Sequence, residues 1–525
     1  MGSNGNITKV SNGHLTETAQ KEYTSYAKTM QSNAAHKVNE HSGDGVEFGE
    51  PEEMVTTEDL ENITVGVFFD GTGNNRNNID RRDDKHSSVY HDKTTGWKWK
   101  WQDNTSYEND RTNVDHLEKM YRKETLYFSI YIEGIGTMND QYDNKIDMGL
   151  GNGLTGIRAK VRFACEELVK RIQSVTKKNV ARLTIDVFGF SRGAAAARNF
   201  VHEITKAAYN AHPGSASYDL SVLYDADGLV VSNNELPARG HFGLLLQTSQ
   251  KKVSQVNIRF AGLFDTVSAY NKNHKDDVSE LYLDAINKAS KIVHLTAADE
   301  TREKFELVSV TKAESEFSIP GVHSDVGGSY RDNVNEHVSL AEEMTSVLNR
   351  EKNISNVRNG LIEQGWYRSW QFKNEQPYKL TGDRTLSNKY SLLPLHLMFE
   401  MGQTTCHFLT TLIDKKLYQI PTVPIGNSKL VLSDVYARLK DYVILKTASS
   451  LIYNTPRQLK SIKKMVDMGV YPLEKYKASY DDHEMLFELR NKYLHFSSNW
   501  DGIGQEPNLN KQGERERDNL NLITK

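Results

Sequence analysis

A strand, a sharp turn and a helix are predicted by residues 183–197, which read LTIDVFGFSRGAAAA. Residues 183–188 are mostly apolar, as in a strand buried on both faces, and the alanine run at 194–197 favours a helix. Between them lies GFSRG at 189–193, whose glycines permit a turn tight enough to lift a serine hydroxyl above the sheet. The pentapeptide alone is a weak signal. With a strand before it and a helix after it, Ser191 becomes a candidate nucleophile.

The same alternation of strands and helices is predicted on both sides of this segment. We expect strands at 63–69, 126–132, 256–263, 307–310 and 316–319, and helices at 114–122, 155–174 and 194–209. Strands that alternate with helices are typical of a parallel sheet. The sequence therefore predicts an α/β fold, with an α/β-hydrolase-like, mainly parallel sheet and helices on both faces.

The length of 525 residues predicts more than one structural part. Residues 1–60 are polar and are expected to be flexible. Residues 61–335 form the expected catalytic domain, with a polar, irregular insertion at about 76–111. Residues 336–525 are expected to form a mostly helical C-terminal module, with a possible role in membrane or partner docking and a charged tail from Gln512.

Composition excludes several classes of protein. The formal net charge of −4 gives no support for nucleic-acid binding. Cys165 and Cys406 are too few for a disulfide framework or a thiolate metal site. The sequence contains no apolar run long enough for a transmembrane helix and no apolar N-terminal signal. We therefore expect synthesis in the cytoplasm and, for any action elsewhere, export by a machine that reads no signal peptide.

A serine nucleophile requires a base and a group that orients the base. Asp265 directly follows the predicted strand at 256–263, and His323 lies in a glycine-flanked loop after the strand at 316–319. Serine, acid and histidine follow one another along the chain in the order that an α/β-hydrolase fold requires. The predicted triad is Ser191, Asp265 and His323.

Simpler interpretations of both partners remain open at this stage. Asp265 could be a turn or helix-capping aspartate, and His323 a loop histidine bonded to Ser324. The rival residues are His396, His407 and His495 for the base, and Asp225, Asp227 and Asp325 for the acid. Core packing explains the three histidines adequately, and Asp325 is close enough to His323 in sequence to shape its loop.

The oxyanion of the reaction needs backbone donors. The N–H of Arg192 is the expected first donor, and the second is expected from Gly71 or Thr72 in the glycine-rich turn after the first strand. A tight turn whose polar residues cap the following helix is an equally good interpretation of this segment.

No cofactor or metal is required by this chemistry. Asp70 with Asn74 or Asn75 could ligate Ca²⁺, but the sequence identifies too few oxygen ligands for a site.

Tryptophan and lysine alternate at 97–101, which places three indoles on one side of an extended segment and two ammonium groups on the other. Such a surface suits a lipid headgroup boundary, and a half-buried edge strand explains it equally well.

Taken together, five motifs resemble a bacterial hydrolase family. They are FFDGTGNN at 68–75, GIGT at 134–137, GFSRG at 189–193, FDTV at 264–267 and PGVHSDVGG at 320–328. In this order they resemble the first family of type VI secretion lipase effectors, over roughly residues 61–335. Weaker similarities to the same family follow at 393–396 and 493–498.

This resemblance implies a serine carboxylic-ester hydrolase, a phospholipase A that acts on membrane phospholipids. It further implies delivery by a contractile secretion machine into the periplasm of a competitor. The implied partners are the secretion spike protein, the bacterial membrane surface and a cognate immunity protein. Ser191, Asp265 and His323 match the nucleophile, acid and base of the family.

Three other functions have some support in the sequence. An esterase or thioesterase on soluble esters would use the same triad, and a non-catalytic module of the secretion spike would use none. FDGT at 69–72 resembles part of an aspartyl-phosphate phosphatase motif. That chemistry requires an aspartate at position 68, where this chain has Phe68.

Overall fold

The computed structural model describes residues 60–84, 105–214, 222–225, 230–271, 276–310, 315–342, 350–376, 378–501, 504–511 and 514–520. Residues 61–525 form one compact unit. The expected flexible segment at 1–60, apart from Leu60, and the tryptophan-lysine alternation at 97–101 lie outside the described residues. None of the helices in the described ranges is long and apolar enough to cross a bilayer.

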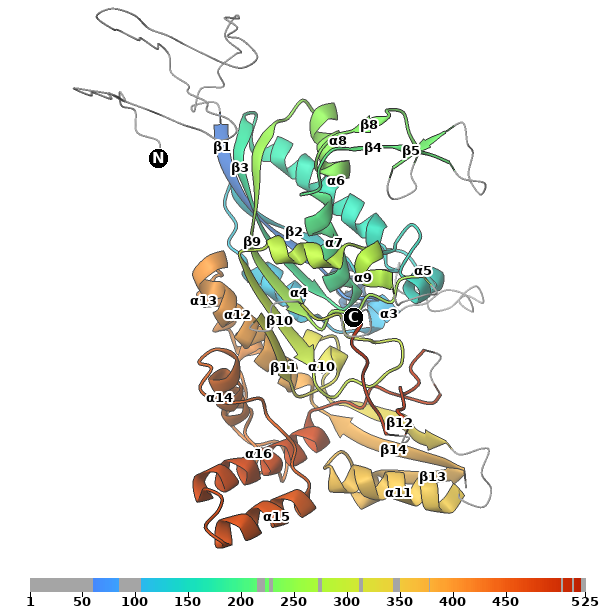
Figure 1. Ribbon diagram of the computed structural model, residues 1–525, viewed down its shortest axis with the longest axis vertical. Helices are drawn as coiled ribbons and strands as arrows, with labels where there is room; N and C mark the ends of the chain where they lie inside the picture. The colour runs from blue at the N-terminus through green and yellow to red at the C-terminus, as the bar shows by residue number, and fades with distance from the viewer. Residues whose placement is uncertain are drawn as a thin grey trace, which may run out of the picture. The chain divides into compact units, whose positions relative to one another are not determined.

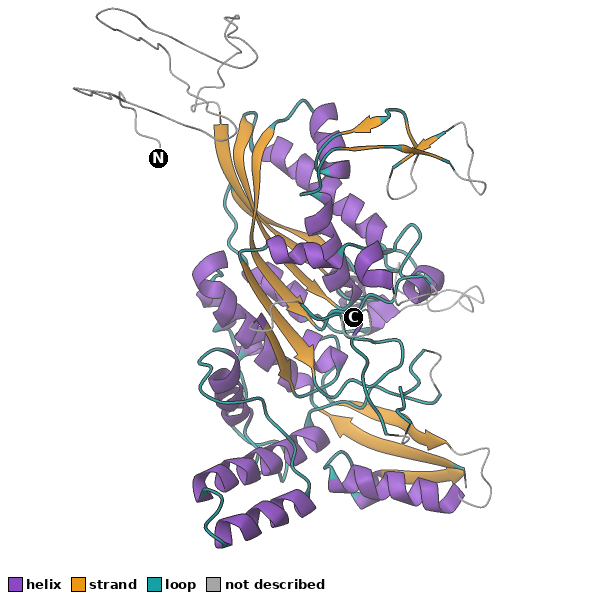
Figure 2. Ribbon diagram, in the orientation of Figure 1, coloured by secondary structure: helices purple, strands orange, loops and turns teal. Residues whose placement is uncertain are grey.

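A six-stranded sheet forms the centre of this unit (Figure 1, Figure 2). In spatial order its strands are β11 (Glu316–Ile319), β10 (Lys291–Ala297), β9 (Val253–Phe264), β3 (Asn179–Phe190), β1 (Leu60–Phe69) and β2 (Tyr127–Ile132). β1 pairs with β2 in parallel, and so do β3 with β9, β9 with β10, and β10 with β11. The predicted mainly parallel sheet is confirmed. Its parallel strands end along one edge, which is where such folds place their functional residues.

Helices cover both faces of the sheet, as predicted. One face carries α6 (Ile157–Val175), α7 (Arg192–Glu203) and α8 (Gly240–Thr248), and the other carries α4 (Asn113–Met120) and α12 (Leu392–Cys406) (Figure 1). Successive side chains of a strand point to opposite faces, which builds the two layers. In β3, Val187 packs among the buried side chains of α6 and α7, whereas Phe188 packs among those of α4 and α12.

Shorter elements connect these layers. The helices are α1 (Arg76–Asp83), α3 (Thr105–Glu108), α5 (Lys145–Leu150), α9 (Asp277–Glu280) and α10 (His323–Gly327). Two small sheets lie between α7 and α8 in sequence. One pairs β4 (Tyr209–Asn210) with β8 (Glu235–Leu236), and the other contains β5 (His212–Pro213), β6 (Leu223–Tyr224) and β7 (Val230–Val231).

The C-terminal region is helical, as predicted, but it also contains an antiparallel sheet that the sequence analysis missed. Its helices, besides α12, are α11 (Arg350–Glu363), α13 (Thr410–Ile413), α14 (Leu432–Val443), α15 (Pro456–Asp467) and α16 (Leu473–Lys492). The sheet has the order β12 (Val334–Glu342), β14 (Lys379–Leu386) and β13 (Phe372–Gln376).

Several local predictions are wrong. The strand expected at 307–310 is not formed, and Leu307 makes only an isolated bridge to Asn519. The insertion at 76–111 is not wholly irregular, because it contains α1 and α3. The helix after Ser191 ends at Glu203, earlier than predicted, and the chain then enters β4. Strand β10, which lies between β11 and β9, was not predicted.

The C-terminal segment returns to the main sheet. We use this name for residues 504–511 and 514–520, drawn in dark red in Figure 1. It forms bridges from Pro507 to Arg302 and from Asn519 to Leu307. Leu520 is 2% exposed and packs among core side chains on the α7 face of the sheet. The charged tail predicted from Gln512 is therefore, over its described residues 514–520, a docked part of the fold.

Candidate active site

Ser191 occupies the turn between β3 and α7. Its backbone has φ 60° and ψ −133°, a strained conformation that serine adopts when a strand turns sharply into a helix. The Ser191 N–H donates to the carbonyl of Phe264, the last residue of β9. A Cβ added to Gly193 would lie 2.2 Å from the carbonyl oxygen of Asp70, so only glycine fits this approach to the turn after β1.

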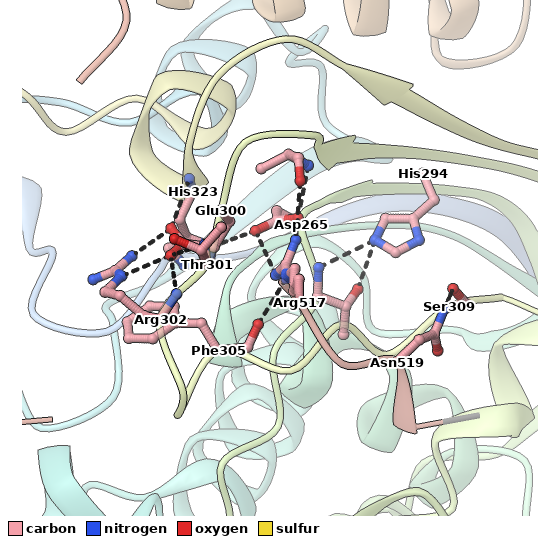
Figure 3. Close-up of polar contacts among 12 residues, drawn as sticks. Asp265, His294, Glu300, Thr301, Arg302, Phe305, Ser309, His323, Arg517 and Asn519 are labelled. Carbon is pink, nitrogen blue, oxygen red and sulfur yellow. Dashed lines mark hydrogen bonds and ion pairs between the residues drawn. The ribbon is translucent and has the colours of Figure 1, made fainter. Parts of the chain in front are cut away.

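The predicted acid and base are in direct contact. Asp265 directly follows β9, and His323 is the first residue of α10. The distance from Asp265 Oδ2 to His323 Nδ1 is 2.5 Å, and both side chains are buried (Figure 3). His323 Nε2, on the far side of the ring, is buried and has no hydrogen-bond partner among the described residues.

Packing brings this pair next to the Ser191 turn. The ring of Phe190, which precedes Ser191, lies 4.6 Å from the His323 ring between centroids. A Cβ added to Gly327 in α10 would lie 2.1 Å from the Phe190 ring, so the helix that carries His323 rests on this phenylalanine. All three predicted triad residues therefore gather at the edge where the parallel strands end.

An ion pair that the sequence did not predict supports His323. Glu300, three residues after β10, accepts a hydrogen bond from the His323 backbone N–H at 3.2 Å. Arg302 binds both oxygens of Glu300, at 3.0 and 2.9 Å. The Arg302 guanidinium also lies 3.3 Å over the Phe305 ring, which in turn packs edge-on against His323. No local motif marks these residues, which follow β10, a strand that was not predicted either.

A second missed partner comes from the C-terminal segment. Arg517 binds both carboxylate oxygens of Asp265, at 2.7 and 2.9 Å (Figure 3). The backbone N–H of Ala297 also donates to Asp265 Oδ1, at 2.8 Å. The acid of the predicted triad therefore has four donors.

Burial and these partners set the protonation of the pair. Burial alone raises the pKa of Asp265, but Arg517 and His323 outweigh it and hold that pKa well below its usual value. Burial lowers the pKa of His323, and the bond to Asp265 only partly opposes this. At neutral pH the imidazole is therefore neutral. With its Nδ1–H donated to Asp265, Nε2 is left with a lone pair that can accept a proton.

The turn after β1 is organised by Asp70. This buried carboxyl accepts from the Gly71 N–H at 2.7 Å, the Thr112 hydroxyl at 2.7 Å and the Tyr131 hydroxyl at 2.5 Å. Burial raises the pKa of Asp70 to about 6, against the lowering by these bonds. The Gly71 N–H, predicted as an oxyanion donor, is therefore already engaged with the Asp70 carboxylate.

Two other backbone donors remain near Ser191. The N–H groups of Thr72 and Arg192 have no acceptor among the residues that the structure describes. Arg192 begins α7, where a helix supplies no acceptor for its first N–H groups. The Arg192 side chain donates to the Thr72 hydroxyl at 2.8 Å and so connects the two turns. The helix-cap interpretation of the turn also holds, because the Asn75 side chain caps α1.

The rival residues have other contacts. His396 Nε2 bonds to the Tyr418 carbonyl, and His407 ends α12. Asp325 binds His495 Nδ1 at 2.7 Å and the Val322 N–H at 3.0 Å. Asp325 therefore shapes the loop of His323, as expected. The remaining rivals are Asp225, which follows β6, and Asp227, which lies outside the described residues.

Comparisons with known proteins agree with the motifs. The model of the family "T6SS, Phospholipase effector Tle1-like, catalytic domain" matches residues 64–348. Among solved structures, the Tle1 effector bound to the VgrG spike from the Type 6 secretion system is 18% identical, with 88% of this chain and 94% of that chain covered and a TM-score of 0.43. An uncharacterized protein from Pseudomonas aeruginosa is 21% identical, with 53% of this chain and 43% of that chain covered and a TM-score of 0.26. No curated protein matches the chain. The chain belongs to the Tle1-like family of type VI secretion phospholipase effectors.

Proposed function

We propose that the protein is a phospholipase A that hydrolyses acyl ester bonds of membrane phospholipids through Ser191, His323 and Asp265. The observation that carries this proposal is the contact between Asp265 and His323. The His323 ring packs on Phe190 next to the strained Ser191 turn, and its Nε2 has no hydrogen-bond partner among the described residues. Membership of a phospholipase effector family supports the substrate class.

In the proposed mechanism, His323 Nε2 removes the Ser191 hydroxyl proton as Oγ attacks the ester carbonyl carbon. The N–H groups of Arg192 and Thr72 bind the resulting oxyanion. When the intermediate collapses, His323 returns the proton to the departing glycerol oxygen, and the lysophospholipid leaves. Water, activated by the same histidine, then releases the fatty acid from Ser191. Throughout, Asp265 holds the ring and stabilises the imidazolium.

The Arg192 side chain supports a phosphate-containing substrate. Arg192 is half-buried as a residue, and the partners of its guanidinium among the described residues are the Thr72 hydroxyl and the Met148 carbonyl, both uncharged. Burial lowers the pKa of Arg192 to about 10, so it stays charged at neutral pH. No carboxylate among the described residues balances this charge. Because a desolvated cation without an anion is costly, we infer that a phospholipid phosphate occupies this position in the complex.

We also propose that the C-terminal region meets the bilayer through the turn between α15 and α16. Met468 and Val470 in this turn are 75% and 69% exposed. Helix α15 adds the basic residues Arg457, Lys460, Lys463 and Lys464. Exposed apolar side chains flanked by a basic amphipathic helix suit an anionic lipid surface.

Delivery by the secretion machine into the periplasm of a competitor remains part of the proposal. It rests on family membership, since the Tle1 effector of known structure is bound to a VgrG spike. We propose a spike protein of this kind as a partner, and a cognate immunity protein as the protection of the producer.

Hydrolysis of phospholipid vesicles by the purified full chain tests the activity, with mass spectrometry of the released fatty acid. A chain that cleaves only soluble esters or thioesters would contradict the phospholipase and favour the alternative esterase. Labelling by a serine-directed phosphonate, lost in Ser191→Ala, separates both enzymes from a non-catalytic spike module. A mixed-chain phospholipid then distinguishes cleavage at sn-1 from cleavage at sn-2.

A further inference from the structure

The C-terminal segment runs alongside the loop that follows β10. The Asn508 N–H donates to the Thr301 carbonyl at 2.7 Å, and the Leu307 N–H donates to the Asp518 carbonyl at 2.8 Å. The Leu520 N–H returns a bond to the Leu307 carbonyl at 2.9 Å. These backbone bonds fix the segment along its described length, so its side chains have defined positions.

Arg517 projects from this segment into the predicted triad. Its two terminal nitrogens meet the two oxygens of Asp265 in a fork, the geometry in which a guanidinium binds a carboxylate most strongly. Its remaining bonds go to the carbonyl oxygens of Phe305, at 2.7 Å, and Ala297, at 3.3 Å. The guanidinium therefore joins the acid to the last residue of β10 and to the loop that follows this strand.

One oxygen of Asp265 is shared between the base and this arginine. Oδ2 accepts from His323 Nδ1 at 2.5 Å and from Arg517 Nη2 at 2.9 Å. The carboxylate charge is therefore divided between the imidazole and a permanent cation. A carboxylate that is held at both oxygens cannot rotate away from His323.

We propose that Arg517 is a positioning residue of the active site, which orients Asp265 and limits the basicity of His323, and that the docked C-terminal segment is thus part of the catalytic apparatus. This inference rests on the proposed Ser191, His323 and Asp265 mechanism. Arg517 is not expected to touch the substrate, because its bonds are directed at the back of the acid.

The charges around the pair determine the sign of the effect. Arg302 and Glu300 face His323 from the segment after β10, and Glu316 at the start of β11 adds a negative charge near Arg517. Removing the Arg517 cation leaves the whole Asp265 charge to the imidazolium, which raises the pKa of His323. The base acts in its neutral form. In a variant without the Arg517 cation, kcat/KM therefore reaches its plateau at a higher pH than in the wild type.

The test uses full-length variants with Arg515 as the matched control. Arg515 lies on the same segment and binds the Ser498 hydroxyl and the Leu340 carbonyl, without contact to Asp265. We expect Arg517→Met to lower kcat by roughly 10- to 100-fold, the loss that slight misplacement of a catalytic group can cause, with KM little changed. Arg517→Lys, which keeps the charge but not the fork, is expected to have an intermediate kcat. Arg515→Met is expected to keep the pH profile of the wild type.

The pKa of His323 is measured independently by NMR titration of histidine rings, with His323→Gln to assign the signal. A higher pKa in Arg517→Met than in wild type and Arg515→Met supports the inference. An unchanged pKa overturns it, whether or not the chain hydrolyses esters. Equal loss of kcat in Arg517→Met and Arg515→Met with a common pH profile also overturns it, because the segment would then be structural only. If Arg517→Met does not fold, a wild-type kcat in Arg517→Lys refutes the role of the fork. A wild type inactive on every ester would instead refute the proposed function.

Discussion

Replacement of Asp265 by asparagine tests the arrangement of the triad most directly. In the structure both carboxylate oxygens accept hydrogen bonds, two from Arg517, one from His323 and one from the Ala297 N–H. An asparagine offers one accepting oxygen and one donating NH2 group. Whichever way the amide turns, its NH2 group meets at least one donor. If it faces His323, the ring must accept at Nδ1 and carry its proton at Nε2, where the base is needed.

The expected loss of kcat follows from this move of the ring proton from Nδ1 to Nε2. A histidine with the wrong tautomer loses about four decades of kcat in a serine triad, which corresponds to about 5 kcal/mol of transition-state stabilisation. The Arg517 cation also loses its counter-charge while buried, and we expect about 3 kcal/mol less stability towards unfolding. The variant should therefore be slow and thermally weakened, but still folded at room temperature.

Initial rates on phospholipid vesicles and thermal unfolding by circular dichroism measure the two effects. Asp325→Asn is the control, since Asp325 lies two residues from His323 and binds His495 instead. A rate of Asp265→Asn within about tenfold of wild type, a difference of only about 1.4 kcal/mol, would refute the assigned role. If Asp325→Asn were then the slower variant, Asp325 would be the acid.

Three further predictions follow from the site. Ser191→Ala and His323→Ala should each abolish turnover on vesicles while circular dichroism shows an intact fold, and appreciable activity of His323→Ala would redirect the search for the base to His396. Burial lowers the pKa of His323, and the base must be neutral to act. We therefore expect kcat/KM to stay constant as the pH falls through the usual pKa range of histidine, and to decrease only at lower pH. A decrease that already begins above about pH 6.5 would contradict this. Arg192→Gln should reduce kcat/KM on phospholipid more than on diacylglycerol. The additional loss on phospholipid should be roughly tenfold or more, as expected for a lost charge-assisted contact. Equal losses on both lipids would contradict the phosphate site.

Short sequence patterns predicted those strands, turns and helices that are determined by neighbouring residues in the chain. The apolar runs of β1, β3 and β9 and the glycines around Ser191 carry information about the strand, the turn and the close approach of α7. The order of Asp265 and His323 along the chain was enough to predict their partnership, and their side chains are in contact. Ser191 and Asp265 sit directly after the strands that position them, and His323 follows β11 within the same short loop.

Long-range contacts could not be predicted in this way. Arg517 meets an acid 252 residues earlier, and a lone arginine in a charged stretch gives no signal of that contact. Strand β10 was missed because its short apolar run is interrupted by His294, which is buried and bonded to Glu316. The Gly71 N–H was predicted as an oxyanion donor, but it donates to the side chain of the preceding residue, Asp70, and the sequence gives no sign of this bond.

The docking of Arg517 bears on how fragments of this protein will behave. The family match ends at residue 348, and a fragment cut there would contain Ser191, Asp265 and His323. It would lack the cation that holds the acid. During translation, too, the triad residues leave the ribosome well before Arg517 does. A nascent chain, or one nicked by a protease ahead of the C-terminal segment, would contain all three residues of the proposed triad but would lack the arginine that binds Asp265.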